Sequence, residues 1–280
     1  KVKEKALKTL RSDISLKELI DLFGEACIAE GLSQKTIVSH RMYLRRLVDI
    51  FGNPRAIDIT SAKAKEARLK LIREGITPAT ECGFVKTARR LYSWAIESEI
   101  IPEPNPFRKI SKPPTASRKR VITDDEFYRI LSVCRNETHR DIFIVMRYTA
   151  ARPGEIRQAE WHMVDWDRQL LVLHKHKTFK KTKKPRIIYL PNIVINILKR
   201  RKVNAAQGSY IFGQPNGQCY RPDSLSSSFT QLVKAADIAK DANGENVVMY
   251  SIRHTALTRA ARAGVTGPQL QVLAGWSSLD

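Results

Sequence analysis

The sequence has little cysteine and no long apolar segment. Its four cysteines lie far apart and form no CxxC pair, at Cys27, Cys82, Cys134 and Cys219, so neither a disulfide framework nor a cysteine-based metal site is expected. No apolar run approaches the roughly 18 residues that a membrane-spanning helix needs, and no Walker A, HExxH or GxGxxG pattern occurs. No signal peptide is visible, although the chain begins at Lys1 and its true N-terminus is not established. We therefore expect a cytoplasmic protein with no metal site and no membrane partner.

What the chain has in excess is positive charge. Its 280 residues contain 49 Lys and Arg against 28 Asp and Glu, a formal net charge of +21. Hydrophobic residues make up 42% of the chain, which is enough for folded cores and argues against a disordered basic tail. A globular chain this basic needs an anionic partner, and extended nucleic acid fits better than a small acidic metabolite. A ribosomal-type or merely soluble basic protein is the alternative at this point.

The first hundred residues show helical periodicity. Residues 1–13 are basic and weakly patterned, and we expect them to form a tail or linker. Over residues 14–100, apolar residues recur at helical spacing in four stretches that begin after Ser15, after Ser33, near residue 61 and near residue 78. Four helices with short connections predict a small helical bundle.

The chain changes character at residues 101–120. This stretch contains five prolines among many cations, at 102, 104, 106, 113 and 114, and we expect an extended basic linker. Residues 121–280 then form a second domain that opens with the capping box Thr123-Asp-Asp-Glu126. Strand patterns at 170–173 and 186–190 lie among further helical patterns. The predicted fold class is mainly α with one small antiparallel β-sheet.

Two short blocks each place an arginine where a turn enters a helix. Arg152 lies in TAARPGE and Arg253 lies in YSIRHT, and the two guanidinium groups are candidates for a clamp on one phosphate. Glu155 is placed either to hold Arg152 or to orient a neighbour. The alternative for the first block is an arginine in a surface salt bridge, and Trp276 in LAGWSS is most simply a core tryptophan.

A dense group of cations lies between the two predicted strands. Seven occur in twelve residues, Lys175, Lys177, Lys180, Lys181, Lys183, Lys184 and Arg186. Like charges at this density repel one another unless an anion lies among them, so we expect most of these side chains to be solvated and available to phosphates. One of them is a candidate general acid, and the others form a non-specific electrostatic patch.

Four segments in this order resemble the tyrosine recombinase family, also called phage integrases. They are TAARPGE, a strand-borne lysine before KKPRIIYLP, YSIRHT and LAGWSS, and the resemblance covers nearly the whole chain. It implies a four-helix, SAM-like core-binding domain followed by a catalytic domain. It also implies that Arg152 and Arg253 clamp the scissile phosphate, with support from Glu155 and from the indole N–H of Trp276. The resemblance places the general acid at Lys181, with Lys180 and Lys183 as alternatives.

The chain departs from the family pattern at two positions. Tyr250 occupies the place of the usual histidine, and a phenol with a pKa near 10 is a poor base at neutral pH, so we expect a positioning role for it. The family's nucleophilic tyrosine follows the Trp276 position on a further helix, and no residue matches it before Asp280. We expect that segment to be missing, so that the chain as given binds DNA without cutting it.

Our first hypothesis is a site-specific recombinase that integrates or excises a mobile element. It implies cleavage of double-stranded DNA at a core site through a 3′-phosphotyrosyl bond, without a cofactor, by a homotetramer located with the nucleoid. We expect further DNA contacts from Lys112, Arg118, Lys119, Lys180, Lys183, Lys184, Arg45 and Lys86. The rival hypothesis is a non-catalytic DNA-binding regulator with the same fold. A type IB topoisomerase is less favoured because of the separate helical bundle and the short chain.

Overall fold

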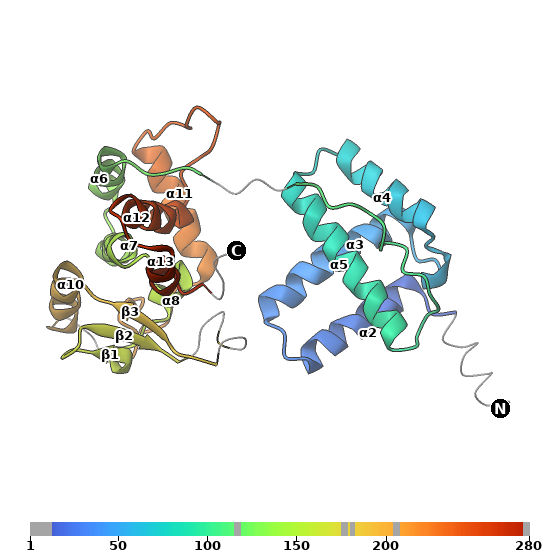
Figure 1. Ribbon diagram of the computed structural model, residues 1–280, viewed down its shortest axis with the longest axis horizontal. Coiled ribbons are helices and arrows are strands. Elements are labelled where there is room, and N and C mark those ends of the chain that lie inside the picture. The colour runs from blue at the N-terminus through green and yellow to red at the C-terminus, as the bar shows by residue number, and fades with distance from the viewer. Residues whose placement is uncertain (1–12, 115–118, 175–178, 180–182, 204–207, 277–280) are drawn as a thin grey trace. The chain divides into compact units, whose positions relative to one another are not determined.

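The protein divides into two compact units, Lys1–Ser117 (unit 1) and Arg118–Asp280 (unit 2) (Figure 1). The computed structural model describes residues 13–114, 119–174, 179, 183–203 and 208–276. Within these ranges, no helix is both long and apolar enough to cross a bilayer.

Unit 1 contains four α-helices in its described part. They are α2 (Leu16–Ala29), α3 (Gln34–Phe51), α4 (Ser61–Arg73) and α5 (Pro78–Glu97), with a 3₁₀ turn, η1 (Ala56–Asp58), before α4. A hydroxyl side chain caps the first turn of each α-helix by accepting a backbone N–H, at Ser15, Ser33, Thr60 and Thr77. Such caps satisfy donors that have no partner inside a helix, so the sequence sets where each helix begins.

The core of unit 1 forms around α5, which packs against the other three helices. Phe84 and Leu91 on α5 are fully buried among leucines of α2 and α3. The Tyr92 hydroxyl donates to the Ala56 carbonyl oxygen at 3.0 Å, so the one buried phenol has a partner.

Residues 101–110 belong to this core, although we expected them to form part of the linker. Ile101, Phe107 and Ile110 are buried against α5. Arg89 fixes the segment by donating from Nε to the Phe107 carbonyl at 3.1 Å and from Nη2 to the Ile110 carbonyl at 2.5 Å. The prolines exclude a helix or strand here, but they do not prevent the apolar side chains between them from packing. The segment that leaves unit 1 is therefore shorter than its proline content suggests.

Unit 2 is mostly helical with one three-stranded antiparallel sheet, in the order β1-β2-β3 (Figure 1). This is the predicted fold class. Its elements are α6 (Asp124–Val133), α7 (Glu137–Thr149), α8 (Pro153–Arg157), η2 (Trp161–Met163), β1 (Val164–Asp165), β2 (Leu170–Leu173), β3 (Arg186–Tyr189), α10 (Asn192–Val203), α11 (Pro222–Ala235), α12 (Met249–Arg262) and α13 (Gly267–Ala274).

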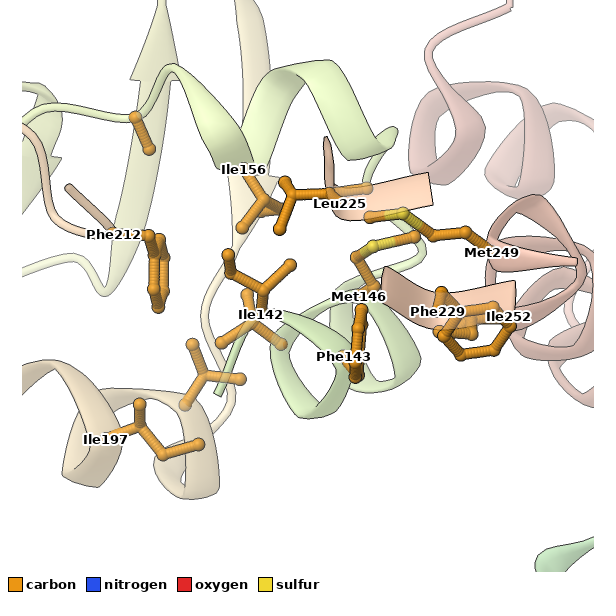
Figure 2. Close-up of a cluster of buried hydrophobic side chains, with 14 of the residues drawn as sticks. Ile142, Phe143, Met146, Ile156, Ile197, Phe212, Leu225, Phe229, Met249 and Ile252 are labelled. Atoms are coloured by element: carbon orange, nitrogen blue, oxygen red, sulfur yellow. The ribbon is translucent and has the colours of Figure 1, made fainter. Parts of the chain in front are cut away.

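The core of unit 2 gathers around α7. Ile142, Phe143 and Met146 on α7 lie among side chains from α8, α10, α11 and α12, as Figure 2 shows. Phe143 meets Phe229 of α11 edge to face, with ring centroids 5.0 Å apart. Helix α7 also packs against α12. Because α7 leads to Arg152 and α12 carries Arg253, this packing brings the two arginine blocks together.

Candidate active site

Arg152 is held at the start of α8 by its own helix. Ala150 adopts a left-handed conformation (φ 53°) that ends α7, and Pro153 begins α8 with Arg152 as its N-cap residue. The Glu155 carboxylate accepts the backbone N–H of Arg152 at 2.8 Å and its Nη1 at 2.7 Å. Of the two roles considered for Glu155, holding Arg152 is the one observed. The Arg152 Nη2 reaches away from α8 and donates to the Gly275 carbonyl at 2.9 Å.

Arg253 lies in the second turn of α12 and is fully buried, with 0% of its surface exposed. Its Nη1 donates to the Ala150 carbonyl and its Nη2 to the Ala274 carbonyl at 2.5 Å. Tyr250 precedes it by three positions on the same helix face and is 53% exposed. Arg253 thus joins the end of α7 to the end of α13.

A third arginine completes the group. Arg186 is the first residue of β3, and its side chain lies on the buried face of the sheet with 5% of the residue exposed. It donates to the Val272 carbonyl from Nη1 at 2.6 Å and to the Leu273 carbonyl from Nη2 at 2.5 Å. Its Nε lies 3.9 Å from the Glu155 Oε1.

These three arginines converge on the C-terminal end of α13. The carbonyls of Val272, Leu273, Ala274 and Gly275 each accept a hydrogen bond from one of them. The last carbonyls of a helix have no partner within the helix and carry its partial negative charge, so they attract cations. Trp276 follows directly and is 42% exposed, so it is not a core tryptophan.

The site has more positive than negative charge. Among the described residues, the only acidic side chain within ion-pair distance of the three guanidinium groups is Glu155. Burial lowers the pKa of Arg186 to about 10, with Glu155 opposing and the other two arginines adding to the shift. Burial also lowers the pKa of Arg253, and the nearby Arg152 adds to that effect. Arg186 and Arg253 are buried, and a buried positive charge without an opposite charge nearby is costly. The arrangement therefore favours an anion such as a phosphate.

Comparison with known proteins agrees with this geometry. The model of the Phage integrase family matches residues 120–280, more than half of the chain. The chain belongs to the phage integrase family.

Two integrase-related proteins show sequence similarity. The Escherichia coli (strain K12) protein named "Putative defective protein IntQ" is 22% identical over 207 residues, which cover 68% of this chain and 51% of that protein. The chain thus spans about half the length of IntQ. The tyrosine recombinase XerA of Pyrococcus horikoshii is 25% identical over 272 residues, which cover 96% of this chain and 89% of XerA.

Solved integrase structures share the fold. A λ integrase dimer bound to a COC′ core site superposes with a TM-score of 0.79 at 17% identity, covering 98% of this chain and 77% of that one. A λ integrase tetramer bound to a Holliday junction gives a TM-score of 0.78 at 18% identity, covering 95% of this chain and 79% of that one. At this level of identity the likeness concerns the fold alone.

The structure places the residues expected for this integrase-family chain in three groups. Arg152 with Glu155 and Arg253 come from separate segments and meet at the end of α13, while Tyr250 lies one turn before Arg253 on α12 and Trp276 directly follows α13, both exposed. Lys181, Lys180 and Arg118 lie outside the described residues. The remaining expected DNA-contacting residues are exposed in their own units, at Arg45, Lys86, Lys112, Lys119, Lys183 and Lys184. In the part of the chain that the structure describes, no three His, Cys, Asp or Glu residues are grouped to hold a metal ion.

Arg186 is an exception to the expectation that most of the seven cations are solvated, because it is buried and bonded to α13. The alternation of the strand carries the signal that was missed: Arg186, Ile188 and Leu190 occur at every second position, and all three are buried. Side chains at i, i+2 and i+4 of a strand share one face, so Arg186 belongs with the core face.

Proposed function

We propose that the complete protein is a site-specific DNA recombinase that integrates or excises a mobile element. One observation carries the proposal: the guanidinium groups of Arg152, Arg186 and Arg253 converge on the carbonyls at the end of α13, and Glu155 is the one carboxylate among the described residues that lies within ion-pair distance of any of them. In the proposed reaction a tyrosine hydroxyl attacks a backbone phosphate of double-stranded DNA and forms a 3′-phosphotyrosyl bond. The 5′ oxygen leaves as a hydroxyl, and attack by another strand's 5′ hydroxyl restores the phosphodiester, so no cofactor is consumed.

The arginines supply the charge that this reaction needs. Negative charge grows on the non-bridging phosphate oxygens as the nucleophile attacks, and fixed donors aimed at those oxygens stabilise the transition state. Arg152 and Arg253 are assigned to this clamp. Their bonds to Glu155, Ala150, Ala274 and Gly275 fix both guanidinium groups before DNA arrives, so little reorganisation is needed during the reaction.

Protons and position are assigned to the remaining residues. Lys181, with Lys180 and Lys183 as alternatives, is assigned to protonate the leaving 5′ oxygen, as the resemblance to the family implies. Tyr250 is assigned a positioning role beside Arg253, three residues away on the same face of α12, and moves no proton. The indole N–H of Trp276 donates a hydrogen bond to the phosphate. The nucleophile is assigned to the tyrosine that follows the Trp276 position in the family pattern.

The proposed partner is a DNA core site bound by four protomers. The λ integrase relatives were solved as a dimer on a core site and as a tetramer on a Holliday junction, and we assign the same kind of assembly to this protein. Phosphate contacts from Arg45, Lys86, Lys112, Lys119 and the hairpin lysines supply affinity that does not depend on base sequence. The proposed location is the cytoplasm, in association with the nucleoid.

A suicide substrate tests the proposal. The product of the complete gene is incubated with duplex DNA nicked beside the cleavage position, so that the cleaved fragment diffuses away and traps the covalent complex. We expect an adduct that survives detergent and disappears on protease treatment. A folded protein that binds the duplex and forms no adduct contradicts the recombinase assignment.

The rival function is a DNA-binding regulator that keeps the fold without the reaction. Tyr250 favours it, because the position lacks the histidine that is usual in the family and has less capacity for proton transfer. The preorganised clamp of Arg152 and Arg253 favours catalysis. Duplex binding without an adduct is the result that the regulator hypothesis expects.

A further inference from the structure

Arg186 has no role in the phosphate chemistry proposed above, yet it makes more contacts with the end of α13 than either clamp arginine. It pairs with Leu173 of β2 in the sheet register, and its guanidinium lies 5% exposed beneath the last turn of α13. A buried guanidinium is costly unless its donors are used. The groups that contact the Arg186 guanidinium should therefore indicate its role.

The donors of Arg186 bind backbone, not phosphate. Nη1 donates to the Ile187 carbonyl at 3.1 Å and to the Val272 carbonyl at 2.6 Å, while Nη2 donates to the Leu273 carbonyl at 2.5 Å. Nε has no hydrogen-bond partner and lies 3.9 Å from the Glu155 carboxylate. The Arg186 side chain thus links strand β3 to helix α13, and it lies close to the Glu155 carboxylate that holds Arg152.

Gly275 shows how closely the chain passes over this side chain. Gly275 ends α13 in the left-handed conformation (φ 61°), and a Cβ added there would lie 2.7 Å from the Arg186 Nε and 2.8 Å from its Cδ. Only glycine meets both conditions without strain. With Arg152 bound to the Gly275 carbonyl, the backbone is held between two arginines just before Trp276.

We propose that Arg186 is a positioning residue of the phosphate site: it fixes the end of α13, so that the chain leaving Gly275 keeps one position relative to Arg152 and Arg253. The inference rests on the proposed function, because that chain leads through Trp276 to the segment assigned to the nucleophile. Arg186 touches no substrate in this role. It acts through the backbone of residues 272–275 and through Glu155.

The first test replaces Arg186 with a side chain of similar length and no charge. In the complete protein, Arg186→Met should lower the single-turnover cleavage rate on the suicide substrate by on the order of 100-fold, because small misplacements of reacting groups cost about that much. Duplex affinity should stay within about twofold, since other cations carry it. Arg168→Met is the matched control, because that arginine lies in the same unit with its side chain 80% exposed. We expect the control to cleave like the parent.

Hydrogen exchange provides a readout that does not depend on cleavage. The amides of Gly275 and Trp276 donate to the carbonyls of Val272 and Gln271, both at 3.1 Å. In Arg186→Met these two amides should exchange faster, while amides in the middle of α12 keep the parent rates. A general loss of structure would instead raise exchange in both places.

The Arg186→Lys variant tests whether the charge of residue 186, and not only its packing, holds the end of α13 in position. A lysine at this buried position has its pKa lowered by burial, so Arg186→Lys should be charged at low pH and neutral at high pH. Its cleavage rate relative to the parent should therefore fall as pH rises. Arg186 keeps its charge across the same range, since its pKa is about 10, so the parent should not show this fall.

Each outcome decides a different point. Parent-like cleavage by Arg186→Met overturns the inference and leaves the proposed function intact. If Arg186→Met does not fold, a ratio of Arg186→Lys to parent rate that is constant with pH overturns it instead. If the parent itself forms no adduct, the proposed function fails, and the exchange rates of Gly275 and Trp276 still decide whether Arg186 fixes the end of α13.

Discussion

Arg45 in unit 1 and Arg253 in unit 2 lie in opposite environments. On α3 of unit 1, the Arg45 side chain is 83% exposed and its nearest carboxylate, on Asp49, is 4.0 Å away. At the site of unit 2, Arg253 is 0% exposed and both of its terminal nitrogens are bonded to backbone carbonyls. An exposed arginine is free to move and is screened by salt, whereas a buried one has a fixed direction and acts in a medium of lower dielectric.

The difference between exposed and buried arginines separates DNA affinity from phosphate chemistry in the proposed function. Mobile surface cations attract any phosphate backbone and displace its counterions, which gives binding without a defined geometry. Fixed guanidinium groups discriminate between the ground state and the transition state only because they cannot follow the phosphate as it changes. Under the proposed function, the net charge of +21 combines two functions, and substitutions should separate them.

Removing a clamp arginine should have the largest effect. Arg253→Ala should lower the suicide-substrate cleavage rate by about 10²–10³-fold, because fixed donors to a developing oxyanion have that effect. Duplex affinity should change by no more than about twofold. Arg45→Ala is the contrasting variant and should show the reverse pattern, with weaker binding and a parent cleavage rate at saturating DNA. If both variants lose binding and cleavage in parallel, the two classes of arginine are not distinct.

The sequence was sufficient to predict the two arginine blocks but not the element on which they converge. Arg152 and Arg253 were recognisable because a local turn, a proline and a family-like motif surround each of them. The carbonyls of residues 272–275 carry no side-chain signal, so nothing in the sequence showed that α13 ends between the two arginines. The charge composition of residues 175–186 does not distinguish Arg186 from the solvated cations, whereas the alternation of its strand does. Residues 101–110 were assigned to a linker because proline content predicts irregular backbone and says nothing about burial.

Gly275 tests the buried arrangement directly. Gly275→Ala should destabilise unit 2 by about 1–3 kcal/mol more than Gly217→Ala, because overpacking a filled site costs that much. Gly217 is the matched control, since it also has a positive φ (76°) but has no atom within 4 Å of an added Cβ. The free energy of unfolding is measured by denaturant titration of each variant.

A double variant links this cost to Arg186. In an Arg186→Met background, the flexible thioether side chain yields more readily than the bonded guanidinium, so the Gly275→Ala cost should approach the Gly217→Ala cost. The double-mutant cycle isolates the coupling. Equal costs for Gly275→Ala in both backgrounds would show that the strain has another source.

The exposed cations should have a smaller and uniform effect. Arg45→Ala and Lys86→Ala should each reduce the slope of log affinity against log salt by about one, as loss of one phosphate contact does. The effect should be the same for specific and unrelated duplexes, because phosphate contacts carry no sequence information. Fluorescence anisotropy at several salt concentrations measures the slopes, and a loss confined to one DNA sequence would instead assign these residues to base contacts.

The smallest expected effect concerns one partly buried histidine in each unit. Burial lowers the pKa of His139 on α7, whose Nδ1 lies 2.9 Å from the Ser228 hydroxyl and whose Nε2 is buried without a partner. Burial also lowers the pKa of His40 on α3, and there the charge of Arg90 adds to the shift. Because each folded unit holds its histidine neutral, the unfolded chain takes up the proton first as pH falls below about 6.5. The stability of both units should therefore decline through that range.

Salt should distinguish the two histidines. Screening weakens the repulsion from Arg90, so added salt should raise the pKa of His40 towards its ordinary value and leave that of His139 nearly unchanged, since burial is the only cause there. Proton NMR titration of the two imidazoles at low and high salt measures both values. His40→Gln and His139→Gln should each remove the acid-dependent loss from its own unit only. Equal salt-induced pKa shifts for the two histidines would show that the charge of Arg90 does not distinguish His40 from His139.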